Sequence, residues 1–169
     1  PDEVRDFVIY QIGALKGFCA LHGTEMQHVK PHGNLYNMSV GNESLLRAIA
    51  EAIAAVDKNL IWVVLGGAQS ALARKIAGEY GIRVAFEAFP DRAYDPDGKL
   101  TSRKKPGAVI EDPQKSAEQA LRMALDNEII AADGTRRPSS ETTPAANAMS
   151  VAIGMPHPSA PSPPALNAT

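Results

Sequence analysis

The sequence predicts an α/β fold built on a parallel β-sheet, and three observations lead to this prediction. Short apolar runs typical of strands alternate with longer segments whose apolar residues recur at helical spacing. The run "LIWVVL" at 60–65 is continuously apolar, as expected for a strand that is buried on both faces. Each strand signal is followed by a helix signal, which favours right-handed crossovers between parallel strands.

The amino-terminal elements are two helices with one strand between them. Segment 1–23 has apolar residues at mostly helical spacing and acidic residues in its first turn, where the helix dipole favours them. Gly23 follows its end. The short run "MQHVK" at 26–30 predicts a strand. Segment 42–57 repeats leucine, isoleucine and valine on one face, which predicts a second helix.

The following elements repeat this alternation. After the strand at 60–65, segment 68–81 predicts a helix that Gly81 terminates. The run "RVAFEAF" at 83–89 predicts a third strand. A long loop then leads to a helix over 112–127, in which Asp112 is suited to cap the first turn and Pro113 to occupy it.

The strand ends indicate where a ligand would bind. In parallel sheets the ligand site lies beyond the carboxyl ends of the strands, in the strand-to-helix loops. Here these loops are "KPHGNLYN", "GGAQS" and "AFPDRAYDPDGKLTSRKKPGAVIED". We expect all three to open onto one face. Three strands do not close a barrel, so the predicted sheet is partial.

The composition divides the chain into two parts. We expect residues 1–135 to form a partial β/α domain. From Arg136 onwards the chain holds seven of its thirteen prolines and no aromatic residue, with mainly Ser, Thr and Ala between them. Such a composition cannot offset the entropy of ordering, so residues 136–169 are predicted to form a disordered tail.

Charge and cysteine content narrow the possible partners. The formal net charge of -2 gives no reason to expect a nucleic acid or an anionic membrane as partner. No apolar run approaches the ~20 residues of a membrane span. The single cysteine, Cys19, excludes an internal disulfide framework and a thiolate metal cluster.

The loop "HVKPHGNLYN" at 28–37 carries the first group of candidate residues. Lys30 offers a cation for a phosphate or a developing oxyanion, and His32 can exchange a proton near neutral pH. Tyr36 and Asn37 add hydrogen-bonding groups for a substrate. The alternative is a tight loop in which the histidine caps the next element, and the spacing alone favours neither interpretation.

The loop after the third strand supplies the second group. Asp91 could orient His32 or act as a base, and Arg92 could hold a substrate carboxylate in bidentate fashion. Glu87, on the strand itself, is a further candidate for substrate binding. The alternative is a turn with a local Asp–Arg ion pair. That alternative explains poorly why the loop exceeds twenty residues, because long ordered loops are usually functional.

The loop "GGAQS" is a weaker candidate for cofactor binding. Gly66 and Gly67 join a buried strand to a helix N-terminus, a geometry that can hold a phosphate on backbone amides. The P-loop lysine and spacing are missing, so a close-packed strand-to-helix turn is the favoured interpretation.

Three segments together carry a resemblance to a known family. "YQIGALKGF", "HVKPHGNLYN" and "EAFPDRAYDPDGKLTSRKKPGAVIED" resemble the central part of the LamB/YcsF family, known as the A subunit of the bacterial 5-oxoprolinase. The resemblance runs from Val8 to Gly134. It implies a seven-stranded parallel β/α barrel similar to the glycoside hydrolase/deacetylase fold. It also implies ATP-dependent opening of 5-oxo-L-proline to L-glutamate, with Mg-ATP and two partner subunits, in the cytoplasm.

The chain departs from the family pattern at both ends. Members usually begin with an Asp-Leu-Asn-Cys-Asp-x-Gly-Glu segment and a Gly-Phe-His-Ala-Gly-Asp segment, and end with Cys-Val-His-Gly-Asp. None of these segments occurs here. The expectation is an incomplete member with a partial barrel.

Side-chain chemistry assigns hypothetical roles at the location that the family resemblance implies. Lys30 would stabilise the phosphorylated or tetrahedral oxygen, and His32 would move a proton to or from the ring nitrogen or water. Asp91 would orient His32 or the water, and Arg92 would hold the substrate carboxylate. Two alternatives stay open: a metal-dependent deacetylase-like hydrolase, of whose ligands only His32 and Asp91 would remain, and an inactive fragment that binds a partner.

Overall fold

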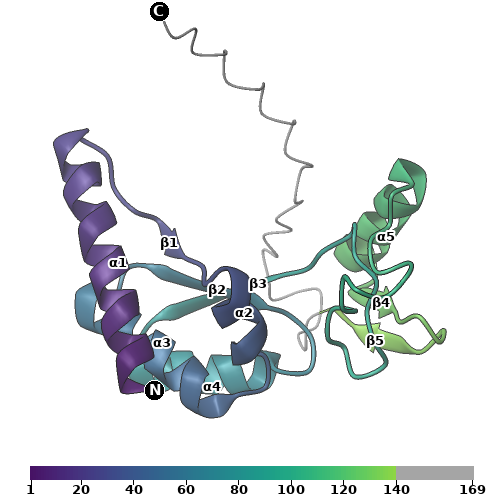
Figure 1. Ribbon diagram of the computed structural model, residues 1–169, viewed down its shortest axis with the longest axis horizontal. Coiled ribbons are helices and arrows are strands. Elements are labelled where there is room, and N and C mark those ends of the chain that lie inside the picture. The colour runs from purple at the N-terminus through teal and green to yellow at the C-terminus, as the bar shows by residue number, and fades with distance from the viewer. Residues whose placement is uncertain (140–169) are drawn as a thin grey trace, which may run out of the picture.

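The computed structural model describes residues 1–139, and it confirms an α/β fold with a parallel sheet (Figure 1). The sheet has the order β1-β2-β3, and β1 and β3 both pair in parallel with the central β2. The strands are β1 (His28–Val29), β2 (Ile61–Leu65) and β3 (Arg83–Glu87). Their carboxyl ends therefore lie at the same edge of the sheet.

Helices connect the strands as the sequence predicts. They are α1 (Asp2–Leu21), α3 (Glu43–Val56), α4 (Ser70–Tyr80) and, after the long loop, α5 (Pro113–Leu125). Two side chains cap helix starts: Asn42 accepts a hydrogen bond from the Leu45 amide, and Asp112 accepts one from the Gln114 amide. Gly81 ends α4 in the left-handed conformation, at φ +69°.

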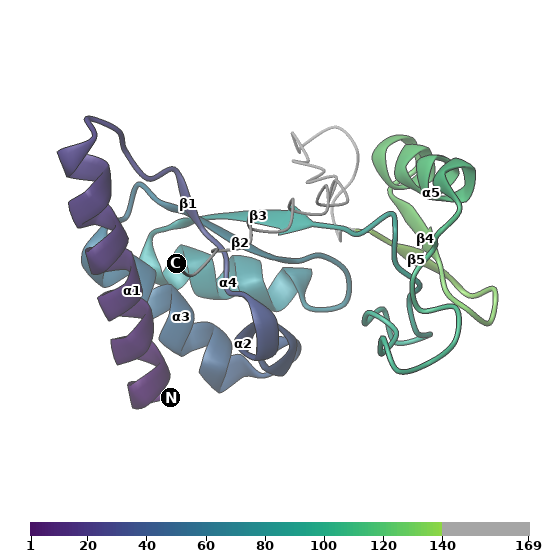
Figure 2. The same ribbon diagram turned by 45° about the horizontal axis from the view of Figure 1, so that its top comes forward.

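The main core lies between the sheet and the helices. Figure 2 shows α1, α3 and α4 on the same side of the sheet. Trp62, Val64 and Phe86 point to that side and pack with apolar residues of the three helices. On the opposite face, Ile61 and Val63 are only half-buried. The prediction that 60–65 is buried on both faces is therefore wrong for these two side chains.

A second, smaller core supports the long loop. It is built where Ala88 and Tyr94 pack against Met123 of α5 and Ile129 of a two-stranded antiparallel sheet. That sheet consists of β4 (Glu128–Ile130) and β5 (Arg136–Pro138).

Three features differ from the sequence prediction. The loop after β1 contains a short helix, α2 (Gly33–Ser39). The β4–β5 hairpin was not predicted. Because β5 pairs with β4, residues 136–138 are part of the folded chain, and the boundary predicted at 135/136 is wrong for them. Disorder of the remaining tail stays a prediction, since 140–169 lie outside the described residues. Within 1–139 no helix has the length and apolarity to span a bilayer.

Candidate functional site

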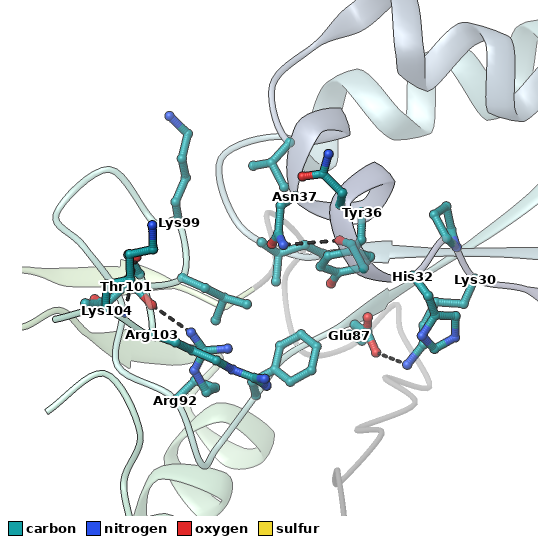
Figure 3. Close-up of a pocket in the computed structure, with 18 residues that line it drawn as sticks. Lys30, His32, Tyr36, Asn37, Glu87, Arg92, Lys99, Thr101, Arg103 and Lys104 are labelled. Carbon is teal, nitrogen blue, oxygen red and sulfur yellow. Dashed lines mark hydrogen bonds and ion pairs between the residues drawn. The ribbon is translucent and has the colours of Figure 1, made fainter. Parts of the chain in front are cut away.

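A cleft of about 790 Å³ lies at the carboxyl ends of β1 and β3. Three segments line it: residues 30–37 after β1, the end of β3, and residues 99–104 of the long loop (Figure 3). Sequence reasoning placed the site at this edge of the sheet, and the structure brings Lys30, His32, Tyr36, Asn37, Glu87 and Arg92 together around the cleft.

A single ion pair connects the two strand ends. The Lys30 ammonium lies 3.0 Å from Oε2 of Glu87, and the Glu87 side chain is only 2% exposed. Glu87 lies opposite Leu65 in the register, on the sheet face that points away from the helices. Removing one partner of a pair buried in this way leaves an uncompensated charge, which is strongly destabilising. Lys30 is therefore structural as well as positioned for chemistry.

Tyr36 lies beside Glu87 in the wall of the cleft. Its ring packs edge-on against Phe89, with the ring centroids 6.2 Å apart. Neither the Tyr36 hydroxyl nor Oε1 of Glu87 has a hydrogen-bond partner within residues 1–139, although both atoms are buried. Burial, and then the negative charge of the nearby Glu87 carboxylate, raise the pKa of the Tyr36 hydroxyl well above its ordinary value. The hydroxyl therefore keeps its proton at neutral pH.

His32 and Asn37 are exposed side chains that line the cleft from the start and the middle of α2. His32 occupies the N-cap position of α2, but its side chain makes no capping hydrogen bond. His32 thus stands where the alternative interpretation places a cap, but its imidazole makes no capping bond and is accessible to a ligand. The Asn37 amide donates to the Gly33 carbonyl at 3.2 Å and so stabilises the short helix.

Asp91 does not join this group. It is absent from the residues that line the cleft, and no hydrogen bond connects it with His32 in the part of the chain that is described. Its Oδ1 is buried without a partner there. The role of Asp91 in orienting His32 therefore stays a prediction that no contact within residues 1–139 supports.

Arg92 lines the cleft but is largely occupied by its own loop. Its Nε donates to the Ala108 carbonyl at 3.1 Å and its Nη2 to the Thr101 carbonyl at 2.7 Å. Burial, and then the positive charge of Arg103, lower the pKa of the Arg92 guanidinium. A bidentate grip on a substrate carboxylate would compete with these two bonds. The clearest role of Arg92 is to fold the long loop over the cleft.

The long loop adds a cationic wall that sequence reasoning only partly anticipated. Arg103 and Lys104 lie in the long loop that the sequence places at the ligand edge of the sheet, whereas Lys99 and Thr101 were not singled out, because a turn-rich loop gives no periodic signal. Lys99 pairs with Asp97 at 3.0 Å. Arg103 and Lys104 have no ion pair among residues 1–139, so the wall can accept an anionic ligand.

The glycine turn after β2 has a different role from the predicted phosphate cradle. The Gly66 amide already donates to the Glu87 carbonyl at 2.9 Å. A Cβ on Gly66 would come within 2.5 Å of the Ser139 carbonyl oxygen, so only glycine fits this close approach. Neither Gly66 nor Gly67 lines the cleft. The turn is close-packed, as the favoured interpretation of the sequence has it, and cofactor binding by Gly66 and Gly67 stays a prediction.

Metal-binding side chains do not gather in the described part of the chain. No group of three or more His, Cys, Asp and Glu side chains in 1–139 is placed to hold a metal ion.

Comparisons with known proteins place this chain in a family. The sequence model of the LamB/YcsF family matches residues 1–153. The chain is 51% identical to the 5-oxoprolinase A subunit of Pyrococcus abyssi over 134 residues, covering 79% of this chain and 51% of that protein. It is 48% identical to the protein of the same name from Coprothermobacter proteolyticus, covering 82% and 52%. The chain thus spans about half the length of the curated relatives it matches.

A solved structure supports the same relationship. The lactam utilization protein from Thermus thermophilus superposes with a TM-score of 0.71 at 44% identity, covering 80% of this chain and 54% of that one. Archaeal proteins are among the relatives, so the bacterial distribution expected from the resemblance is too narrow.

Proposed function

The chain belongs to the LamB/YcsF family, and we propose that its cleft is part of the active site of an ATP-dependent 5-oxoprolinase. This enzyme would open the cyclic amide of 5-oxo-L-proline to L-glutamate, with the chain acting alongside two partner subunits in the cytoplasm. Relatives named as the A subunit of 5-oxoprolinase and a structural neighbour named lactam utilization protein support this proposal, since 5-oxoproline is a lactam.

The observation that carries the proposal is the charge pattern of the cleft. One buried carboxylate, Glu87, is paired with Lys30 at the strand ends, and the opposite wall presents Arg103 and Lys104 without ion pairs among the described residues. The substrate carries a carboxylate and ATP carries phosphates, so both would be attracted to such a wall.

We also infer that the three-stranded sheet is one part of a β/α barrel. In such barrels the helices cover the outside and the inward-facing side chains pack in layers. Ile61 and Val63 are half-buried on the face away from α1, α3 and α4, and Glu87 lies on this same face at the carboxyl end of β3. A closed barrel would enclose these side chains and place Glu87 at its mouth.

The proposed chemistry begins with activation of a poor electrophile. ATP would supply a phosphoryl group to the lactam carbonyl oxygen, and Arg103 and Lys104, which have no ion pair among residues 1–139, fit its phosphates. Lys30 would stabilise negative charge on the reacting oxygen. Water then adds to the carbonyl carbon, the carbon–nitrogen bond breaks, and His32 would deliver a proton to the departing nitrogen. Ring opening in this way leaves glutamyl phosphate, an acyl phosphate that a second water molecule would hydrolyse, so that the products are glutamate, ADP and phosphate.

The test is turnover of the chain assembled with its partner subunits. His32→Ala should lower turnover by roughly 10²–10⁴-fold, the usual scale for a general acid–base residue. Its melting temperature should stay unchanged, because His32 is exposed and makes no side-chain capping bond. His22→Ala, an exposed histidine at the end of α1, is the matched control. Full turnover by His32→Ala would place the proton transfer elsewhere, and no turnover by the unmodified assembly would refute the proposed function.

A further inference from the structure

Two buried polar atoms in the cleft wall lack the partners that buried groups normally have. They are the Tyr36 hydroxyl and Oε1 of Glu87. The Tyr36 side chain is 9% exposed and the Glu87 side chain 2%. The Glu87 carboxylate acts on the Tyr36 hydroxyl through its charge and through hydrogen bonding, but neither atom meets the geometry of a hydrogen bond within residues 1–139, so both stay open to a ligand in the cleft.

The two atoms differ in what they can offer. Oε2 of Glu87 is occupied by the Lys30 ammonium, which leaves the lone pairs of Oε1 available to a donor. The Tyr36 hydroxyl keeps its proton, since burial and the neighbouring carboxylate raise its pKa. The wall therefore presents one acceptor and one donor next to each other, as the positions of Tyr36 and Glu87 in Figure 3 illustrate.

Both side chains are held in place by packing. Tyr36 is fixed by its edge contact with the Phe89 ring and by its position on α2. Glu87 is fixed by the Lys30 pair and by the register of β3 with β2. A pair of groups held in this way is preorganised for one hydrogen-bonding pattern.

We propose that Tyr36 and Glu87 form a donor–acceptor pair that binds the amide edge of a lactam. The Tyr36 hydroxyl donates to the ring carbonyl oxygen, and Oε1 of Glu87 accepts from the ring N–H. A small lactam holds its amide in the cis form, so its N–H and C=O point to the same side. An open-chain amide is almost always trans, with the two groups on opposite sides, and cannot satisfy both partners at once.

This inference rests on the proposed function for its substrate, and it adds the residues that would distinguish the ring from its opened product. Glutamate lacks the amide edge altogether. The pair would therefore bind the substrate in preference to the product, and release would follow ring opening.

The experiment measures equilibrium binding to the 169-residue chain by NMR titration. The ligands are 5-oxo-L-proline, 2-pyrrolidinone, and the N-methyl derivative of each, which lacks the N–H. We expect both parent lactams to bind more tightly than their N-methyl forms. Tyr36→Phe should weaken binding of the parent lactams by about tenfold, on the scale of one hydrogen bond. Tyr80→Phe, on α4 and away from the cleft, should bind them as the unmodified chain does.

Tyr36→Phe is the test variant because it should leave the fold intact. Glu87→Gln removes the counter-charge of Lys30, whereas Tyr36→Phe removes only a hydroxyl without a partner among residues 1–139, so it should fold normally. Retained lactam affinity in a folded Tyr36→Phe chain, or equal affinity for N-methyl forms, would overturn the inference and leave 5-oxoproline binding intact. Tyr36-dependent binding of 2-pyrrolidinone without binding of 5-oxo-L-proline would keep the inference and refute the proposed substrate. Absence of binding by either lactam would refute both.

Discussion

Two buried tyrosines, Tyr94 and Tyr36, differ in whether the hydroxyl has a hydrogen-bond partner. The Tyr94 hydroxyl accepts a hydrogen bond from the Phe89 amide at 2.8 Å, which fixes the chain just after β3. The Tyr36 hydroxyl has no partner within residues 1–139. Both side chains are buried, so their rings contribute similarly to packing. The two hydroxyls should therefore contribute very differently to the free energy of unfolding.

The first prediction compares Tyr94→Phe with Tyr36→Phe. Tyr94→Phe leaves the Phe89 amide without its partner and should lower the free energy of unfolding by about 1–3 kcal/mol. Tyr36→Phe should change it by less than about 0.5 kcal/mol. Urea unfolding of both variants, followed by circular dichroism, provides the comparison. Equal destabilisation by the two variants would mean that Tyr36 has a structural partner after all.

Individual site residues were predictable where they follow directly from a strand. The position of Lys30, His32 and Glu87 around one cleft was predictable because a parallel sheet fixes where its strands end, while their roles stay predictions. Asp91 and Arg92 could not be assigned in the same way. Their orientation depends on the path of the long loop, whose carbonyl groups occupy the Arg92 guanidinium.

At the scale of elements, one ion pair ties the first helix to the third. Lys16 on α1 donates to Oδ2 of Asp57, the residue after α3, at 2.8 Å. Hydrogen bonding by Lys16, and then by the Asn59 amide, lowers the pKa of the Asp57 carboxyl. The folded-state pKa is thus below the unfolded value of about 3.9.

The second prediction follows from the sign of this shift. A lowered folded-state pKa contributes stability above the unfolded pKa, and this contribution is lost as the pH falls through the folded-state pKa. Asp57→Asn should therefore melt at a lower temperature than the unmodified chain at pH 7, by a small amount because the pair is solvent-accessible. The two melting curves should converge as the pH falls below the folded-state pKa of Asp57. A difference that persists unchanged at low pH would exclude the charge as its cause.

Helices and strands were predictable from the sequence where a pattern of neighbouring residues marks them. Helix α3 was found because apolar residues repeat on one face of it, and α5 was found because Asp112 and Pro113 also mark its start. The short helix α2 was missed because its apolar residues are too few to show a period. The β5 strand was missed because proline and arginine are poor strand signals, and it forms through pairing with β4.

At the scale of the molecule, the cleft depends on two separately packed parts. The first, with β1–β3 and helices α1, α3 and α4, supplies Lys30 and Glu87. The second, around Tyr94 and Met123, supports the long loop that carries the cationic wall. Gln119 of α5 connects the second part to the chain that leaves β3, because its side-chain amide donates to the carbonyls of Phe89, Pro90 and Arg92. The sequence could not predict this arrangement, since it depends on contacts between residues far apart in the chain.

The most direct measurement of the central claim is a map of amide chemical shifts on titration with 5-oxo-L-proline. L-proline, which has the same ring and carboxylate but no lactam carbonyl, is the control ligand. We predict saturable shifts in residues 30–37 and 99–104 with 5-oxo-L-proline, and much smaller ones with L-proline. Shifts confined to the Gly66–Gln69 turn or to α1, or an equal response to both ligands, would contradict the assignment of this cleft as the lactam site.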